Sequence, residues 1–559
     1  MRDHDRSAGD RWLRFRHAVI LRCAALVVAV LAVVTLVTGA AAQAAAPVRV
    51  VPFETRAADG TALRGDVYLP DTGGPVATVL QLSPYWNTVK GPGELQAGSA
   101  AVRPFVEAGF AVALVNLRGT GGSGGCFQWG SRLDWGDAST VVGVLAAQPW
   151  SNGNVGMYGT SYEGWAQYMA MADPPPSLKA AVPISGVIDV WSLLTRQGAP
   201  IPIGPVASTA FGAATSFLGV ESAVVDHVGC PGYVTHLREG MELVATGDRT
   251  PYYQQRDLRP LLTDSAVPVL MANGLRYVDE GHTLQFEDLW ALLRKDRTRF
   301  MLGQWGHGGV RPDFTRLAIG WFDHYLRAGP QATAPGIVEY QDDTGAWHTA
   351  PSWPPPTEPV PLYLSGQELI ATRSAVTSSQ RSFPSLDLGA LAALTSATVE
   401  DQGRRGPGRT CGPQQLVYVS APLAQEIRVA GNFSADLTVS SSLPGGNLVA
   451  TLYHTSGQGS CAELLSGAQD SGRIQLDLKH WQQPGTSRPF PTGTPTRVTA
   501  QSLPLATVIP AGDRLILTIG ATAPEILPDP LKPTITIGTG EALPGSLSLP
   551  VVTGKLRFR

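Results

Sequence analysis

Charged side chains are scarce in this chain of 559 residues. Asp, Glu, Lys and Arg make up 16% of it, and 42 basic side chains stand against 45 acidic ones, a formal net charge of −3. Without a basic excess or runs of Lys and Arg, we expect no nucleic-acid partner. The hydrophobic fraction of 43% is too high for a disordered chain. With 62 Gly and 45 Pro, the composition indicates many turns between short strands.

Cysteine is also rare, and none of the five cysteines has the spacing of a zinc site. We therefore predict no metal. Apart from Cys23, an even number remains, which is typical of an exported chain with disulfides. Among the three possible connectivities we favour Cys126–Cys230 and Cys411–Cys461, because each pair stays within one predicted domain. The connectivity itself stays open.

Long apolar runs are confined to the N-terminus. An Arg-rich segment precedes an uncharged apolar stretch, Cys23–Val37, and small residues follow it. These are the three parts of a secretory signal, so residues 1–44 are predicted to be removed near Ala42-Gln43-Ala44. The alternative is a retained membrane anchor over residues 23–42, which is just long enough to span a bilayer. We expect a secreted or extracytoplasmic protein with no stable membrane partner unless that segment is retained.

Residues 45–335 are predicted to form an α/β domain. Short apolar runs such as Ala77–Leu82 and Phe110–Leu117 suit strands buried on both faces of a mostly parallel sheet. They alternate with segments of helical spacing, such as Asp137–Gln148, which favours a doubly wound fold. The alternation breaks at about 191–264, where an insertion between two strands is predicted to form a helical cap.

Residues 336–559 have a different pattern. After a Pro-rich connector around Trp353-Pro354-Pro355-Pro356, short alternating strands recur with almost no helical periodicity. This pattern predicts an all-β sandwich.

The segment most informative about chemistry is Gly159-Thr160-Ser161-Tyr162-Glu163-Gly164. It follows a predicted strand and opens a predicted helix, which is the context of a nucleophile elbow. Small flanking residues would allow Ser161 a strained backbone with an exposed hydroxyl. The N–H of Tyr162, at the helix N-terminus, would then point at a developing oxyanion.

A serine nucleophile needs a base and an orienting acid, in the chain order Ser, acid, His. His307 lies between glycines after a strand and is our candidate base, whereas His324 lies in a helical stretch and suits packing. Asp279 follows the strand Val267–Ala272 and is our candidate acid, with Glu280 as the alternative.

The chain resembles the CocE/NonD and X-Pro dipeptidyl-peptidase family of serine hydrolases, over nearly all of its mature length. The elbow has the family's form, G-x-S-Y-x-G. The remaining motifs that carry the resemblance are Ser83-Pro84-Tyr85, Arg118-Gly119-Thr120-Gly121-Gly122-Ser123, Gln148-Pro149-Trp150-Ser151-Asn152-Gly153 and Gly303-Gln304-Trp305-Gly306-His307.

This resemblance implies an α/β-hydrolase domain followed by a C-terminal jelly roll. It also implies that Tyr85 donates its hydroxyl to the oxyanion, and that no cofactor is used. The family often places its triad acid three residues after a glycine at the strand end. Counting from Gly274 reaches Tyr277, and Asp279 lies two residues later, so this loop departs from the family's pattern.

The function predicted is hydrolysis of peptide or ester bonds through a Ser-His-Asp triad and an acyl-enzyme, in an X-Pro dipeptidyl-peptidase-like enzyme. The expected partner is a short peptide or a small-molecule ester. Glu163 is a candidate for binding the substrate's α-ammonium group, and a residue of the helix flank otherwise. The alternatives are a carboxylesterase or α-amino-acid ester hydrolase and, from another class, an inactive hydrolase that binds carbohydrate or a wall polymer.

Overall fold

A computed structural model of the protein describes residues 48–86, 96–201, 230–276, 285–331, 333–385, 415–461, 464, 469–521, 529, 532–540 and 545–559. Residues 48–559 form one compact unit. The predicted signal segment, 1–44, and the alternative anchor, 23–42, lie outside the described residues. Within the ranges above, the structure contains no helix long and apolar enough to cross a membrane.

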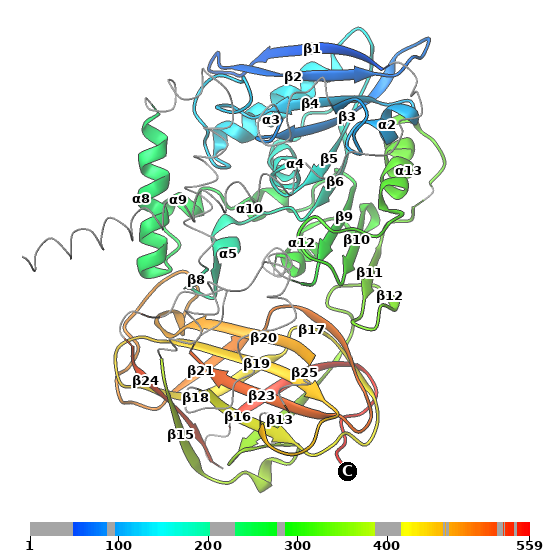
Figure 1. Ribbon diagram of the computed structural model, residues 1–559. Helices are drawn as coiled ribbons and strands as arrows, with labels where there is room; N and C mark the ends of the chain where they lie inside the picture. Colours follow the sequence, from blue (N-terminus) through cyan, green and yellow to red (C-terminus); the bar gives the residue numbers. More distant parts are fainter. Residues whose placement is uncertain are drawn as a thin grey trace, which may run out of the picture. The chain divides into compact units, whose positions relative to one another are not determined.

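The first half of the unit is built on one ten-stranded sheet (Figure 1). Its central strands are parallel, whereas antiparallel strands close both edges. In sheet order the strands are β1 (Arg49–Arg56), β2 (Ala62–Leu69), β4 (Ala111–Asn116), β3 (Val76–Ser83), β5 (Ser151–Thr160), β6 (Leu178–Ile184), β9 (Val269–Gly274), β10 (Thr298–Gly303), β11 (Ile337–Gln341) and β12 (Trp347–Ala350). The sheet continues beyond residue 335, where the sequence predicts the domain boundary, because β11 pairs with β10.

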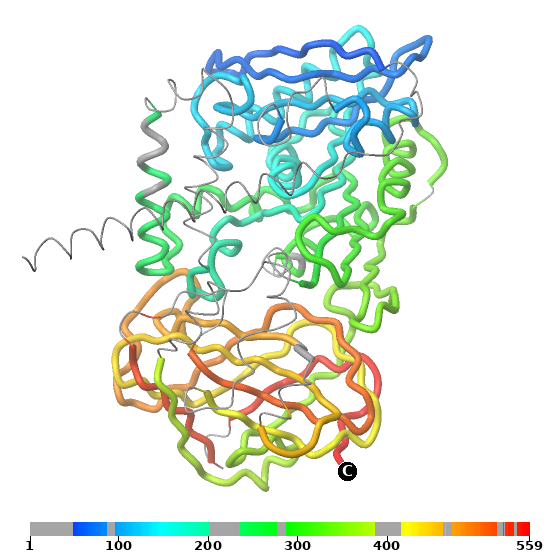
Figure 2. The backbone as a smooth tube through the Cα atoms, in the orientation of Figure 1, coloured from blue at the N-terminus to red at the C-terminus, as the bar shows by residue number. Residues whose placement is uncertain are grey.

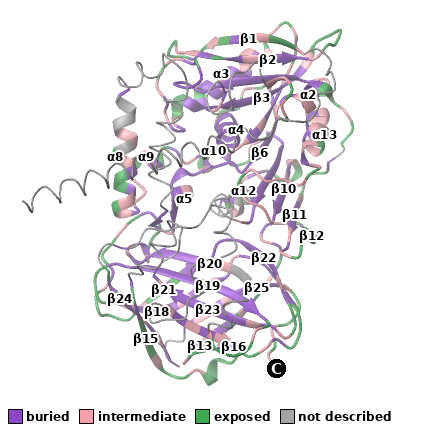
Figure 3. Cartoon of the chain, in the orientation of Figure 1, coloured by how far each residue is buried: buried purple, intermediate pink, exposed green. Residues whose placement is uncertain are grey.

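Helices cover both faces of this sheet, as its uninterrupted apolar strands require. On one face, α3 (Arg132–Ala146) and α4 (Tyr162–Ala172) pack on side chains such as Leu80 and Ala113. On the other, α2 (Arg103–Glu107) and α13 (Phe314–Arg327) pack on Val79 and Val112. Adjacent residues of one strand thus contribute to apolar layers on opposite faces of the sheet. Figure 3 shows that the strands between the two layers are buried.

The predicted cap lies between β6 and β9. Its described elements are α5 (Val190–Leu194), β7 (Thr195–Arg196), β8 (Ala199–Pro200), α8 (Pro231–Thr246), α9 (Pro251–Gln254) and α10 (Arg259–Leu262). Two further short helices, α12 (Phe286–Leu292) and η2 (Lys295–Arg297), lead from β9 to β10. A buried Asp189 accepts hydrogen bonds from Arg249 and Arg259, so the start of the cap is tied by ion pairs to its last turns.

Residues 358–559 form the predicted all-β domain, in a thirteen-stranded arrangement. Its strands are β13 (Glu358–Ser365), β14 (Glu368–Ile370), β15 (Ser379–Pro384), β16 (Gln415–Ser420), β17 (Ile427–Gly431), β18 (Ser434–Ser441), β19 (Asn447–Thr455), β20 (Gln469–Asp477), β21 (Thr496–Gln501), β22 (Leu505–Ile509), β23 (Arg514–Gly520), β24 (Thr534–Thr539) and β25 (Ser546–Thr553), with short helices η3 (Arg373–Ala375) and η5 (Leu478–His480). The first strand, β13, pairs with the last, β25. Figure 2 traces the chain of this domain, which is coloured from green to red along the sequence.

Polar side chains join the β domain to the cap. The Gln197 amide donates to the carbonyls of Gln475 and Gln501, at 3.0 and 2.8 Å. The Asp248 carboxylate accepts from the backbone and hydroxyl of Ser487. On the cap side, these contacts come from the segments on either side of α8, so the β domain fixes the base of the cap.

A buried carboxyl group begins helix α3. Asp134 Oδ2 accepts the N–H groups of Gly130 and Ser131, at 2.7 and 3.0 Å, in a capping box with Ser131. The other oxygen, Oδ1, has no hydrogen-bond partner among the described residues. Burial, reinforced by the charge of Asp137, raises the pKa of Asp134 to about 7.

Replacing Asp134 by Asn should flatten the pH dependence of stability. The folded protein holds this proton between about pH 4 and 7 and the unfolded chain does not, so wild-type stability falls as pH rises through that window. Asn keeps an acceptor for the two N–H groups and does not ionise. We expect Asp134→Asn to gain about 1–3 kcal/mol relative to wild type between pH 5 and 8.

Calorimetric melting at pH 5, 6, 7 and 8 measures this difference. Asp71→Asn, at an exposed position, is the control and should follow the wild-type profile. Parallel profiles for wild type and Asp134→Asn would show that Asp134 is ionised in the folded state throughout.

Candidate active site

Ser161 is the single residue between strand β5 and helix α4, and its backbone is strained. Its φ of +66° is one that residues with a side chain rarely adopt. Two backbone hydrogen bonds hold it there: its N–H donates to Ile184 on β6, and its carbonyl accepts from Trp165 in α4. The strained turn is therefore fixed by both elements that flank it.

Two glycines make this turn possible. A Cβ at Gly159 would lie 2.5 Å from Cβ of Glu163, and Gly159 itself has a φ of +144°. A Cβ at Gly164 would lie 2.8 Å from Cα of Gly186, so α4 approaches the backbone after β6 closely. The glycines expected from the elbow pattern thus have a steric reason to be glycine.

Tyr85 and the N–H of Tyr162 converge beside the Ser161 hydroxyl. The Tyr85 hydroxyl donates to Ser161 Oγ at 3.2 Å and accepts the Tyr162 N–H at 3.4 Å. Burial, together with the charge of Glu163, raises the pKa of Tyr85 to about 12. The phenol therefore remains protonated, and a donor, at neutral pH.

Glu163 turns back onto the elbow. Its carboxylate accepts the N–H of Thr160 at 3.0 Å, and only 2% of the residue is exposed. This contact spans the serine and joins the first turn of α4 to the end of β5. It corresponds to the helix-flank interpretation of Glu163 that the sequence left open beside the ammonium-binding one.

His307 follows β10, on a loop that reaches the elbow. The next residue, Gly308, donates its N–H to Ser185 Oγ at 3.1 Å, and a Cβ at Gly308 would lie 3.1 Å from Cγ2 of Thr160. Ser185 directly follows β6 and is fully buried. The loop of the candidate base is thus anchored beside the residue that precedes Ser161.

The other candidate histidine is engaged elsewhere. His324 lies in α13, where its Nδ1 contacts the Gly329 carbonyl at 2.8 Å. That contact is a helix C-terminal one and suits the packing role expected for it.

The candidate acids, Asp279 and Glu280, and Tyr277 before them, lie outside the described residues. The strand end that leads to them is described, and it is bound to the histidine loop. Leu275 and Arg276 donate their N–H groups to the carbonyls of Gly303 and Trp305, at 2.8 and 3.2 Å.

Gln304 links these two loops to the β domain. Its Oε1 accepts from Arg276 Nε at 2.8 Å, and its Nε2 donates to the carbonyls of Gln341 and Ala506, at 2.9 and 3.0 Å. Ala506 belongs to β22. Sequence reasoning did not single out Gln304 or Ser185, and a glutamine three residues before the histidine carries no signal of this role.

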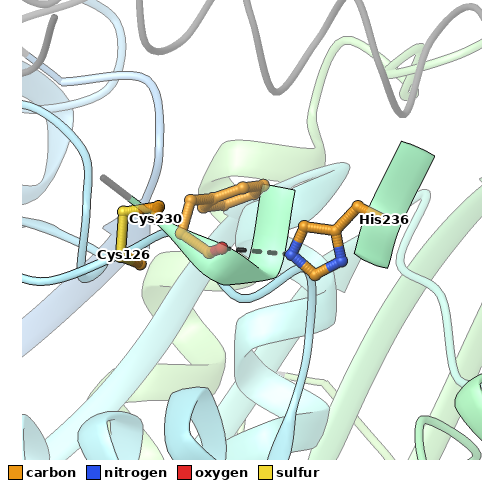
Figure 4. Close-up of a disulfide and its surroundings, with 4 residues drawn as sticks. Cys126, Cys230 and His236 are labelled. Atoms are coloured by element: carbon orange, nitrogen blue, oxygen red, sulfur yellow. Dashed lines mark hydrogen bonds between the residues drawn. A yellow bond between two sulfur atoms is a disulfide. The ribbon is translucent and has the colours of Figure 1, made fainter. Parts of the chain in front are cut away.

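A disulfide ties the cap to the α/β domain close to the elbow. Cys126 pairs with Cys230, the residue before α8. In the second turn of α8, His236 bonds to the Phe127 carbonyl through Nε2 at 3.2 Å (Figure 4). The ring of Phe127 lies 5.7 Å from that of Tyr162, so this anchor reaches the residue after the candidate nucleophile.

Only one cysteine of the second predicted disulfide lies among the described residues. Cys461 is a disulfide-bonded cysteine, whereas Cys411 lies outside the described residues. Over the parts of the chain that the structure describes, no group of three or more His, Cys, Asp or Glu side chains is arranged to hold a metal ion.

The parallel sheet, the strained serine between strand and helix, and the histidine loop after a later strand define an α/β-hydrolase. Two family models match consecutive parts of the chain. Residues 59–309 match the X-Pro dipeptidyl-peptidase (S15) family, and residues 330–545 match the X-Pro dipeptidyl-peptidase C-terminal non-catalytic domain. The chain belongs to this family, and it is a serine hydrolase of the dipeptidyl-peptidase or esterase type.

Relatives of both types are similar in sequence. A putative Xaa-Pro dipeptidyl-peptidase of Streptomyces avermitilis is 24% identical, over 81% of this chain and 73% of the relative. The cocaine esterase of a Rhodococcus species is 25% identical, over 73% of this chain and 80% of the relative.

Solved structures support the fold over nearly the whole chain. An aminopeptidase from a marine sediment archaeon (Thaumarchaeota) superposes with a TM-score of 0.73 at 18% identity, covering 90% of this chain and 97% of its own. An α-amino-acid ester hydrolase superposes with a TM-score of 0.71 at 18% identity, covering 92% and 99%. The two-domain arrangement predicted from the sequence is therefore confirmed.

Removing the Cys126–Cys230 bridge should destabilise the protein and loosen the cap. The bridge joins residues 104 positions apart, and a loop of that size corresponds to a chain-entropy stabilisation of up to about 4.7 kcal/mol. We expect the double variant Cys126→Ser/Cys230→Ser to lose about 2–5 kcal/mol and part of its activity. Thermal melting and hydrolysis rates measure both, and reductant should bring wild type towards the variant. Equal melting temperatures would contradict a stabilising role for the bridge.

Proposed function

We propose that this protein hydrolyses acyl bonds through a covalent acyl-enzyme on Ser161. The observation that supports this most is the arrangement at the elbow: a strained serine whose hydroxyl lies 3.2 Å from a tyrosine that stays protonated, next to the helix N-terminus. His307 acts as the base and Asp279 as the acid that orients it, with Glu280 the alternative acid.

The first step forms the acyl-enzyme. His307 takes the proton of the Ser161 hydroxyl while Oγ attacks the substrate carbonyl carbon. The carbonyl oxygen becomes an oxyanion that accepts hydrogen bonds from the Tyr85 hydroxyl and the Tyr162 N–H. Before the substrate binds, the Tyr85 hydroxyl donates to Ser161 Oγ and accepts the Tyr162 N–H, so both donors already lie beside the attacking oxygen.

The first step ends when His307 gives its proton to the leaving amine or alcohol, which departs and leaves the acyl group on Ser161 Oγ. In the second step His307 accepts a proton from a water whose oxygen attacks the acyl carbon. His307 then returns this proton to Ser161 Oγ as the carboxylic acid product leaves, so the Ser161 hydroxyl is restored. No atom of the protein is consumed, and no cofactor is used in this scheme.

The first candidate substrate is a short peptide whose second residue is proline, cleaved after that residue. Both family models that match this chain are described as parts of X-Pro dipeptidyl-peptidases. Such a substrate has a free α-ammonium group, which requires a carboxylate at the end of its binding site.

The second candidate is a carboxylic or α-amino-acid ester, and the position of Glu163 favours it. The carboxylate two residues after the nucleophile, our candidate for binding the ammonium group, is only 2% exposed and accepts the Thr160 N–H. An ester hydrolase needs no ammonium-binding carboxylate.

We further propose that the protein is exported. The N-terminal segment has the parts of a secretory signal, and a disulfide bridge at Cys126–Cys230 suits an oxidising compartment. Peptides or small esters outside the cytoplasm would then be its substrates.

Hydrolysis of an Ala-Pro anilide and of a short acyl ester tests the proposal. Wild type should cleave at least one of them, and Ser161→Ala should lose at least a thousandfold in kcat. Anilide cleavage that disappears when the substrate's amine is blocked would establish the peptidase, whereas cleavage of the ester alone would establish the esterase. Ser161→Ala with wild-type rates on either substrate would refute Ser161 as the nucleophile.

Tyr85→Phe should lower kcat by about 10²–10³-fold with little change in KM, because it removes one oxyanion donor. The matched control is Tyr168→Phe on α4, whose hydroxyl is buried and contacts Met271 Sδ, 3.9 Å away. That variant should keep a wild-type kcat. A Tyr85→Phe enzyme as active as the control would remove Tyr85 from the oxyanion site.

A further inference from the structure

Strand β22 of the β domain turns one edge towards the α/β domain. Among the described strands it pairs only with β17, where Ala506 lies opposite Ala430 and Val508 lies opposite Arg428. In an antiparallel pair, the backbone groups of alternate residues point away from the partner strand. The Ala506 carbonyl and the Val508 N–H belong to this outer edge, because both bond to side chains of the α/β domain.

Two polar side chains occupy the outer edge of β22 in place of a further strand. The Gln304 amide donates to the Ala506 carbonyl at 3.0 Å, and one oxygen of the Asp343 carboxylate accepts the Val508 N–H at 2.9 Å. The other oxygen of Asp343 accepts the Thr507 hydroxyl. Three consecutive residues of β22 are therefore bound by side chains that come from two different loops of the α/β domain.

Apolar packing supports the same contact between the domains. Ala506 is 4% exposed, and with Ala430 of β17 it belongs to the buried cluster that contains Tyr340 and Ala350 of strands β11 and β12. The place of β22 against the α/β domain is thus fixed by packing as well as by polar bonds. Loss of one polar side chain should therefore leave the two domains joined.

Gln304 and Asp343 differ in what else they bind. Asp343 lies in the turn between β11 and β12, and among the described residues its carboxylate bonds only to β22. Gln304 belongs to the histidine loop, where its N–H donates to Gln341 Oε1 at 3.2 Å. Its amide donates to the Gln341 carbonyl as well as to β22, and its side-chain oxygen accepts from Arg276 at 2.8 Å. Both N–H bonds and the oxygen of this amide are thus engaged, which fixes its orientation.

A short packed turn connects Gln304 to the candidate base. The ring of Trp305 lies against Gly309, where a Cβ would be only 2.7 Å from the Trp305 side chain. The Gly309 N–H donates to the Gly306 carbonyl at 3.0 Å and closes the turn that carries His307. A displacement of Gln304 would therefore shift this turn as a unit, and the imidazole of His307 with it.

We propose that Gln304 is a positioning residue for His307, and that the β domain sets the position of the base through it. The Ala506 carbonyl holds the amide from the β domain, while Arg276 holds it from the end of β9. A misplacement of about 1 Å in a catalytic geometry can cost about a hundredfold in rate. This inference rests on the proposed function, because Gln304 has this role only if His307 is the base.

Substitution of Gln304 with and without His307 tests the proposal. Gln304→Met keeps an unbranched side chain of similar length and removes all three side-chain hydrogen bonds. A fluorophosphonate probe, which reacts with a serine nucleophile, should label wild type, and Gln304→Met should slow this labelling about 10–100-fold. Since Gln304 acts through His307, the double variant Gln304→Met/His307→Ala should be labelled as slowly as His307→Ala alone. A purely structural role would slow labelling by the same factor in both backgrounds.

Asp343→Ala is the matched control, because it removes bonds to the same strand from a side chain outside the histidine loop. Its melting temperature should fall at least as far as that of Gln304→Met, while its labelling rate stays close to that of wild type. If Gln304→Met failed to fold, Gln304→Glu would take its place. That variant keeps the acceptor for Arg276 and lacks the donors to both carbonyls, so it should also be labelled slowly.

The outcomes separate this inference from the proposed function. Labelling of the Gln304 variant at the wild-type rate, or an equally slow rate in Asp343→Ala, would overturn the positioning role and leave the proposed function intact. Failure of the proposed function has another signature. Wild type would then carry no label on Ser161, or His307→Ala would be labelled as fast as wild type, and the inference about Gln304 would be overturned with it.

Discussion

The backbone of Ser161 is the constraint on which the rest of the site depends. A φ of +66° is unfavourable for serine, and it persists because β5, β6 and α4 each bind or crowd the turn. This conformation leaves the hydroxyl beside Tyr85 and the first N–H of α4. If the close approach between Gly164 and Gly186 or the Glu163 contact with Thr160 were lost, the turn would relax. The Tyr85 hydroxyl and the Tyr162 N–H would then no longer lie beside the Ser161 hydroxyl.

The histidine loop is positioned from several directions. Ser185, at the end of β6, accepts the N–H of Gly308, and Gln304 connects the loop to Arg276 and to β22 of the β domain. The β domain therefore contacts the catalytic half at the root of the His307 loop as well as at the base of the cap. Its role therefore extends to the geometry of the candidate base.

Local patterns in the sequence were sufficient for the fold and for the strand–serine–helix turn of the elbow. The apolar runs and the glycine spacing of the elbow follow from strand burial and from steric limits, and helix α4 covers the range expected for it, Tyr162–Ala172. Non-local contacts were not predictable. Nothing near Glu163 indicates that it turns back to Thr160, and the partners of Gln304 lie far along the chain. The pairing of the edge strands β11 and β12 with the α/β sheet is likewise a non-local contact, and the composition of residues 337–350 does not indicate it.

The claim that Ser161 is the nucleophile is tested most directly by covalent labelling. Treatment with diisopropyl fluorophosphate, followed by peptide mass spectrometry, should place one diisopropylphosphoryl group on Ser161, and His307→Ala should slow this labelling strongly. Label on another residue, or an equal rate in the His307 variant, would contradict the account of this site.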